Sequence, residues 1–425
     1  MGLRSKARLA CVCAACGLVL CARAAAAQVL QGQPIVLANG AVTLSGDFSA
    51  STGLDDPGFY NYTDYQSTDA AQELESADSS LRRVRAALSG RVKAGDHFSF
   101  LGELRIQSAG SSQIWDSRPE ASALYVRIRP WVDRALDIQV GRIPPTFGAF
   151  GRRPYTSDNP LVGYPLGYQY LTSLRPDAIP ANADDLLQMR GRGWLSDFEV
   201  GNPTRKRGVP LAATFRWDTG VQVHGTSDMI DVTGSITTGT LANPLVKDDN
   251  SGRQLAGRVA VHPIVGLVVG ASGSRGPFFA TNAVRAATTQ DPDTFTQTAW
   301  GADAEYSRGY YLLRAETIVS RWTIPAVSAP FIDGPVRATS VSVEGRYKIL
   351  PGLYAAARVD HLGFSTITGT AGPRTWDAPV DRLEMGAGYY VQRNLLLKGC
   401  YQFDRRDTNR VPRDHLAGAE VVFWF

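Results

Sequence analysis

The stretch DHLAGAEVVFWF, residues 414–425, decides how this chain is interpreted. Read with a period of two, it separates its side chains onto two faces, as a β-strand does. On this segment alone, an edge strand of a soluble β-sandwich and a membrane-spanning strand both remain open. One face carries His415, Ala417, Ala419, Val421, Phe423 and Phe425, and the other carries Leu416, Gly418, Glu420 and Trp424.

The N-terminus has the three parts of a secretory signal peptide, with cleavage expected after Ala27. The apolar run is shorter than the ~20 residues that a spanning helix needs. Lipidation at Cys21 is disfavoured, because Leu20 occupies a position where a small residue is required. The parts are Arg4, Lys6 and Arg8, then the apolar residues 9–22, then Arg23 and the alanines 24–27.

Removal of residues 1–27 changes the bulk properties of the chain. The formal net charge of +4 falls to about zero, because four basic residues and no acidic ones leave with the signal. Four of the five cysteines leave as well, so Cys400 remains alone and no internal disulfide can form. The basic balance therefore gives no argument for binding nucleic acid.

Alternation of apolar and polar residues recurs through residues 28–425 and predicts 16 antiparallel strands, within a range of 14 to 18. Long connections alternate with turns of two to four residues. The predicted strands are 42–54, 83–93, 97–108, 121–131, 135–143, 215–225, 230–239, 253–262, 264–274, 295–307, 310–322, 336–349, 353–364, 380–391, 395–404 and 414–425.

Each predicted strand has an apolar face and a face that carries charges. A sandwich of 16 such strands would need a dry core, which charged inner faces do not provide. A closed, transmembrane up-and-down β-barrel solves the problem, with apolar residues facing lipid and charged residues facing a water-filled lumen. Aromatic residues near the strand ends are expected to form interfacial girdles. They are Trp131, Trp217, Tyr306, Tyr310, Tyr311, Trp322, Tyr347, Tyr389, Tyr390 and Phe425.

The third long connection, residues 144–210, has a different texture from the rest. It is rich in Pro, Gly and Tyr and lacks a sustained period, apart from one or two helical turns expected at 184–190. A long irregular stretch in a compact protein is usually functional or disordered. Its aromatic residues argue against disorder, although they more often hold such a loop rigid than form a sugar-stacking track.

The export signal, the strand layout, the long third loop and the terminal Phe425 together resemble a general Gram-negative outer-membrane porin. The specific sequence likeness is confined to GRIPPTFG, residues 141–148, and to the last strand. The resemblance implies a 16-stranded barrel, a third external loop that folds into or over the pore, and a homotrimer in outer-membrane lipid. No subfamily can be assigned.

A basic wall is predicted on the inward faces of the second to fourth strands. The resemblance implies that acidic residues of the third loop oppose this wall and set ion selectivity. A hydrated lining that merely balances charge is the alternative, and the mixed signs of the later strands are expected to form such a solvated wall. The wall residues are Arg83, Arg85, Arg91, Lys93, Arg105, Arg127 and Arg129, and the candidate loop acids are Asp158, Asp184 and Asp185.

Catalytic and metal-binding motifs are absent from the sequence. The five histidines are scattered singly, and neither HExxH nor GxSxG occurs. No enzyme activity and no cofactor are therefore expected. The sequence predicts an outer-membrane porin for passive diffusion of small hydrophilic solutes or ions. A substrate-specific channel for sugars or oxyanions such as phosphate, and a non-transport barrel that acts as scaffold or adhesin, stay open as alternatives.

Overall fold

The computed structural model of the protein describes residues 33–55, 83–109, 119–153, 155–191, 208–214, 217–245, 248–407 and 413–425. The predicted signal peptide lies outside these residues, and so do residues 192–207 of the third long loop. None of the described helices is long and apolar enough to span a membrane.

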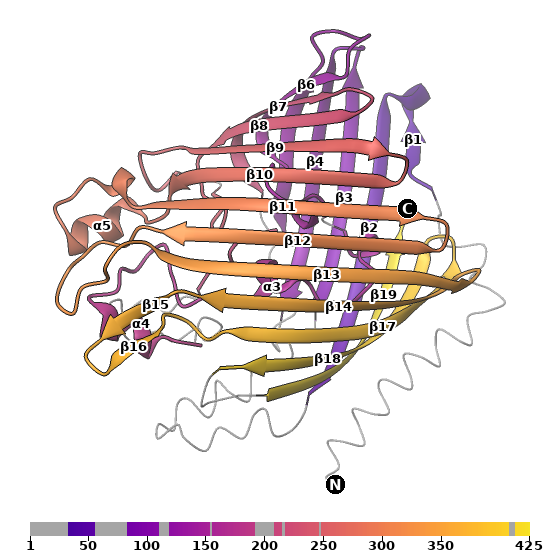
Figure 1. Ribbon diagram of the computed structural model, residues 1–425. Coiled ribbons are helices and arrows are strands. Elements are labelled where there is room, and N and C mark those ends of the chain that lie inside the picture. Colours follow the sequence, from indigo (N-terminus) through magenta and orange to yellow (C-terminus); the bar gives the residue numbers. More distant parts are fainter. Residues whose placement is uncertain are drawn as a thin grey trace.

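Sixteen antiparallel strands form one closed ring, as predicted (Figure 1). Consecutive strands pair around the ring, and the last strand returns to the first. The strands are β2 (Val42–Asp55), β3 (Arg83–Ala94), β4 (Phe98–Ala109), β5 (Glu120–Ile128), β6 (Leu136–Ile143), β7 (Asp218–Thr226), β8 (Ile230–Thr237), β9 (Gln254–Ile264), β10 (Leu267–Pro277), β11 (Thr296–Arg308), β12 (Tyr311–Trp322), β13 (Val336–Leu350), β14 (Leu353–Phe364), β17 (Val380–Gln392), β18 (Leu395–Arg406) and β19 (Arg413–Trp424).

The terminal residue completes the closure. Phe425 and Gly46 exchange two backbone hydrogen bonds of 3.0 Å, which extend the β19–β2 ladder to the last residue. A short strand outside the ring, β1 (Ile35–Leu37), pairs with the start of β2. A closed ring leaves no unpaired strand edge, which a bilayer would otherwise penalise.

The two faces of the barrel are distributed as the alternation predicts. Leu88, Phe98, Phe100 and Leu104 are each about half exposed on the outer surface. The inward positions of the same strands are polar, and Glu103 is buried there. The apolar rows therefore face outward and do not meet in a dry interior.

Short turns lie at one end of the barrel and long connections at the other (Figure 1). The hairpin expected at Pro263 instead turns at Val265 and Gly266, which lie between the paired residues Ile264 and Leu267. Gly266 has φ +87°, and a Cβ there would lie 2.3 Å from the Ser307 carbonyl oxygen. Gly266 therefore determines the position of the turn, whereas Pro263 had indicated another position in the sequence.

The long connections carry ordered elements that alternation could not reveal. The stretch 365–379, expected to be a plain loop, contains a hairpin of β15 (Thr366–Gly369) and β16 (Gly372–Thr375). The helical turns expected at 184–190 are confirmed as α4 (Ala183–Gln188). The other short helices of the described residues are η2 (Ala38–Gly40), η4 (Phe150–Arg152), η5 (Thr156–Asp158), α3 (Leu166–Gln169), α5 (Thr281–Ala287) and η6 (Pro292–Thr294).

Exposed residues of the expected aromatic girdle gather at the short-turn end. Tyr310, Tyr311 and Tyr347 are exposed there, and the rings of Tyr311 and Tyr347 lie 5.0 Å apart. Trp217 and Trp322, expected in the girdle, are buried instead. Trp322 belongs to a hydrophobic cluster that joins the long connections to the inner wall, because its position in β12 points inward.

Candidate functional site: the lumen segment and its charged wall

The chain that follows β6 enters the barrel along the inner wall. Thr146 accepts a hydrogen bond of 2.7 Å from Gln222 of β7 and donates one of 2.8 Å to Ser235 of β8. The backbone N–H of Gly148 donates to Ser272 of β10 at 3.1 Å. These three wall residues belong to the inward-facing, buried rows of their strands.

Residues 149–168, called here the lumen segment, form an excursion whose two ends meet. The carboxylate of Glu316 on β12 accepts the N–H of Ala149 at 2.8 Å and the hydroxyl of Tyr168 at 2.7 Å. The rings of Phe150 and Tyr168 lie 4.9 Å apart. One carboxylate and one pair of rings therefore close the base of the excursion.

The far point of the lumen segment is η5, which contacts the opposite side of the ring. The hydroxyl oxygens of Thr156 and Ser49 on β2 are 3.0 Å apart. Tyr155 donates its hydroxyl to Glu103 of β4 at 2.7 Å. Since β12 lies nearly opposite β2 to β4 in the ring of 16 strands, the segment crosses the lumen.

The segment then returns along β14, β17 and β18. Tyr354 donates its hydroxyl to the carbonyl of Pro160 at 2.9 Å, and Glu384 accepts the N–H of Gly163 at 2.7 Å. A Cβ at Gly163 would lie 2.4 Å from the Glu384 carboxylate, so only glycine permits this approach. Val162 is completely buried against this wall.

Two tyrosines of the segment donate hydrogen bonds to carboxylates of the wall. Burial, followed by the neighbouring Glu103 carboxylate, raises the pKa of Tyr155. Burial, followed by the Glu316 carboxylate, raises the pKa of Tyr168 well above its ordinary value. Both hydroxyls therefore stay protonated at physiological pH and keep their hydrogen bonds to the wall.

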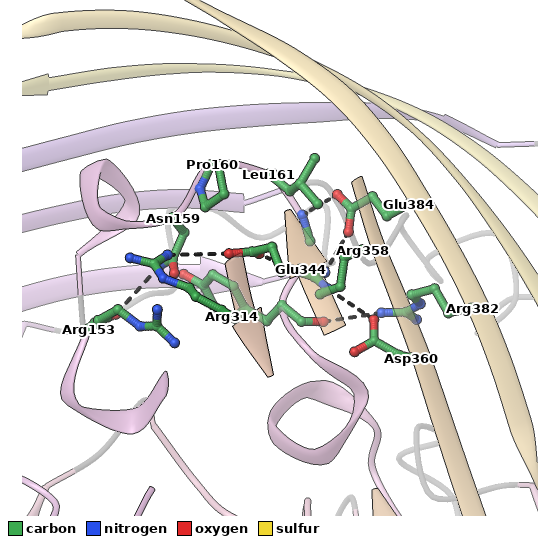
Figure 2. Close-up of polar contacts among 12 residues, drawn as sticks. Arg153, Asn159, Pro160, Leu161, Arg314, Glu344, Arg358, Asp360, Arg382 and Glu384 are labelled. Carbon is green, nitrogen blue, oxygen red and sulfur yellow. Dashed lines mark hydrogen bonds and ion pairs between the residues drawn. The ribbon is translucent and has the colours of Figure 1, made fainter. Parts of the chain in front are cut away.

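A buried guanidinium organises the wall behind the returning chain, as Figure 2 shows. Arg358 of β14 is 1% exposed and contacts three carboxylates: Glu384 at 2.6 Å, Asp360 at 2.9 Å and Glu344 at 3.3 Å. Glu344 also accepts from Arg314 of β12 at 3.3 Å. Because Glu384 in turn holds the lumen segment, this network couples four strands to the loop.

The mixed-sign strands are therefore not the solvated wall that was expected. Glu344, Arg358 and Glu384 are Cα partners in one ladder row, so the guanidinium on β14 lies between the carboxylates on β13 and β17. Asp360 is 1% exposed and Glu384 is fully buried. The sequence shows opposite charges at inward positions of consecutive strands. Which of these charges form pairs can be inferred only once the strand register is known.

Comparison with solved structures finds proteins with a similar architecture. The anion-selective porin from Comamonas acidovorans has 10% identity and a TM-score of 0.54, covering 90% of this chain and 99% of that one. The Salmonella typhi OmpF complex with daunomycin has 12% identity and a TM-score of 0.53, covering 92% and 100%. Vibrio cholerae OmpT, an outer-membrane protein, has 11% identity and a TM-score of 0.53, covering 92% and 99%.

The chain has the porin fold. No known family profile and no curated protein sequence matches it, so the likeness is one of structure. A porin-fold barrel with a lipid-facing apolar surface belongs in an outer membrane.

The predicted basic wall of this porin-fold barrel divides into two parts. Arg85 and Arg105 are buried near the lumen segment, where Arg105 contacts Glu103 and the Arg85 guanidinium lies 5.5 Å from the Tyr155 ring centre. The other part lies toward the short-turn end, where Asp137 contacts both Arg127 and Arg129. Arg91 is half-buried there and Lys93 is exposed, while Arg83 lies on β3 with its side chain outside the description.

The three candidate loop acids do not gather at one place. Asp158 is on η5 inside the barrel and is exposed, and its carbonyl accepts from Arg314. Asp184 accepts from the N–H of Thr370 at 2.8 Å, in the β15–β16 hairpin. Asp185 accepts from the N–H of Ala181 at 2.8 Å, and burial raises its pKa against the effect of that bond. Asp184 and Asp185 therefore secure α4 within the long connections.

Sequence reasoning named Asp158 of the lumen segment but missed its two arginines, Arg152 and Arg153. Arg152 is exposed in η4, and Asp158 is exposed in η5. Arg153 lies between the Phe150 ring, 5.6 Å away, and the Glu305 carboxylate, 3.3 Å away. Only the path of the loop reveals that these charges border the passage. Among the described residues, no group of three or more His, Cys, Asp or Glu side chains could hold a metal ion.

A disulfide tests the crossing of the lumen. In the variant Ser49→Cys/Thr156→Cys, with Cys400→Ser to remove the native thiol, we expect a disulfide to form on oxidation. The two hydroxyl oxygens are 3.0 Å apart, and disulfides require Cβ atoms about 3.5–4.5 Å apart. Mobility on non-reducing gels after proteolysis gives the measurement. A matched pair, Ser45→Cys/Thr156→Cys, moves the wall cysteine four residues along β2 and should not crosslink.

Proposed function

We propose that this barrel is a diffusion channel for small hydrophilic solutes, narrowed by the lumen segment. The observation that carries the proposal is the crossing of residues 149–168 from Glu316 to Ser49 within a polar inner wall. A narrow polar constriction with fixed charges sets selectivity in a pore. No cofactor and no catalytic step are needed for such passage.

The basic vestibule at the short-turn end favours anions in this proposal. The vestibule residues Arg91, Lys93, Arg127 and Arg129 lie on inward positions of β3 and β5 or just beyond them, and Asp137 contacts Arg127 and Arg129. These four cations and one anion together carry a net positive charge, which leaves a positive local field. Such a field raises the local concentration of anions at the mouth of the passage.

Neutralising the vestibule tests the selectivity. We expect the variant Arg91→Gln/Arg127→Gln/Arg129→Gln to shift the reversal potential in planar bilayers, under a KCl gradient, toward cation preference. The reason is that Asp137 would remain with fewer compensating positive charges. A lipid-facing triple variant, Arg275→Gln/Arg321→Gln/Arg337→Gln, removes the same charge outside the lumen and should leave the reversal potential unchanged. An equal shift in both variants would contradict the proposal.

Solute titration separates the open channel from its rivals. A current that saturates with, or is blocked by, a sugar or phosphate would favour a substrate-specific channel. A folded barrel without conductance would favour a scaffold or adhesin. The homotrimer implied by the porin resemblance stays a prediction, to be measured by native mass spectrometry in neutral detergent.

A further inference from the structure

Three arginines cross the outer surface of four neighbouring strands in one ladder row. Arg275 of β10 pairs with Thr298 of β11, Thr298 pairs with Arg321 of β12, and Arg321 pairs with Arg337 of β13. All three arginines are exposed. Neighbouring strands lie about 4.8 Å apart, so the guanidinium groups share one strip of surface. Arg275, Arg321 and Arg337 are called here the rim arginines.

The outward faces of the four strands supply no counter-charge to this strip. Strands β10 to β13 are described in full, and their outward positions carry no Asp or Glu. Within the described part of the chain, no side chain forms an ion pair with a rim arginine. Like charges directly opposite each other on a sheet are destabilising, which applies to Arg321 and Arg337. A ligand of opposite charge would remove that cost.

The height of the rim arginines matches the level of lipid headgroups. They lie at the strand ends that lead into the long connections, at the end of the barrel near α5 (Figure 1). The row of Tyr311 and Tyr347 lies ten residues away along β12, at the short-turn end. Ten residues at about 3.3 Å each, tilted by about 40°, span about 25 Å along the membrane normal, which is the height of the apolar band of such barrels.

A tryptophan marks the same boundary. Trp300 of β11 is 63% exposed and lies one outward position deeper than the row of Thr298. Tryptophan prefers the interface between acyl chains and headgroups. The rim arginines therefore stand just outside the acyl region, where the phosphates of a lipid lie.

We propose that the rim arginines bind the phosphorylated headgroup of a lipid in the leaflet at the long-loop end. Arginine suits this ligand, because its planar fork donates two parallel hydrogen bonds to one phosphate and keeps its charge. Two opposed guanidinium groups and a third two strands away favour a headgroup with more than one phosphate. The proposal needs the barrel to be in lipid but is independent of whether it conducts.

The test compares lipid affinities of the purified, folded barrel in neutral detergent. Native mass spectrometry would follow titration with bisphosphorylated lipid A, monophosphoryl lipid A and phosphatidylcholine. We expect the affinity to fall in that order. The variant Arg275→Gln/Arg321→Gln/Arg337→Gln should bind bisphosphorylated lipid A about a hundredfold more weakly, at roughly fivefold for each arginine. The variant Arg275→Lys/Arg321→Lys/Arg337→Lys should lose less affinity for bisphosphorylated lipid A, since it keeps the positive charges but lacks the planar guanidinium groups.

The matched control removes three exposed basic residues at the short-turn end, in the variant Arg308→Gln/Lys348→Gln/Arg393→Gln. It should retain the wild-type affinity. Equal weakening in both triple variants would overturn the proposal as unspecific charge attraction, and no weakening in the rim variant would overturn it directly. A change in oligomeric mass with unchanged lipid affinity would instead assign the row to a contact between copies. Because the substitutions remove opposed like charges, the rim variant should fold, which heat-dependent gel mobility verifies.

Discussion

Deleting the crossing of the lumen should increase the single-channel conductance several-fold. The variant replaces residues 150–167 with a four-residue Gly/Ser linker. A short linker suffices, because Ala149 and Tyr168 both contact the Glu316 carboxylate. A ring of 16 strands encloses an aqueous lumen, so removal of the segment that spans it widens the narrowest cross-section. Single-channel recording in KCl gives the measurement.

The control inserts the same linker beside Ala371, in the exposed turn of the β15–β16 hairpin. Its conductance should equal that of the wild type, since this turn lies outside the lumen segment. Heat-dependent gel mobility would establish that both variants form barrels. A folded deletion variant with wild-type conductance would show that the segment does not limit flow.

Removal of the buried guanidinium should produce the largest loss of stability. The variant Arg358→Met would leave Glu344, Asp360 and Glu384 adjacent without their shared cation. Breaking a buried ion pair from one side costs about 3–5 kcal/mol, because the remaining charge keeps its desolvation penalty. We expect a lower midpoint in guanidinium unfolding from lipid vesicles.

Two further variants isolate the charge effect. Adding Glu384→Gln to Arg358→Met should restore part of the lost stability, since one uncompensated carboxylate is then removed. The surface substitution Arg308→Met, at an exposed position, should change the midpoint little. If the single variant Arg358→Met is as stable as the wild type, the network does not hold the wall together.

The barrel was predictable from the sequence because alternation is a local signal. The same period of two that separates His415 from Leu416 sets which residues face lipid in most of the ring, and it is broken locally by bulges such as the one in β5, where Ser122 and Ala123 are both buried. Turn chemistry was less reliable. Pro263 predicted the position of a hairpin turn, but Gly266, three residues later, determines it. The positive φ of Gly266 decides where the chain reverses, whereas the missing N–H of Pro263 at the end of a strand does not.

The lumen segment could be located in the sequence but not traced. Its anchors pair residues far apart, such as Glu316 with Ala149 and Glu384 with Gly163, and no local pattern encodes these contacts. The acids Asp184 and Asp185 show the limit clearly. Their charge fitted a constriction, whereas their hydrogen bonds to Thr370 and Ala181 hold the helix α4 to its neighbours.

The meeting of both ends of the lumen segment at Glu316 makes this piece of chain an exchangeable cassette. Sequence between Phe150 and Gly167 can be shortened, lengthened or recoded while its two attachment points stay in register with β12. A single scaffold of 16 strands could therefore host a series of filters, each with its own aperture and charge, without alteration of the surface that meets the bilayer.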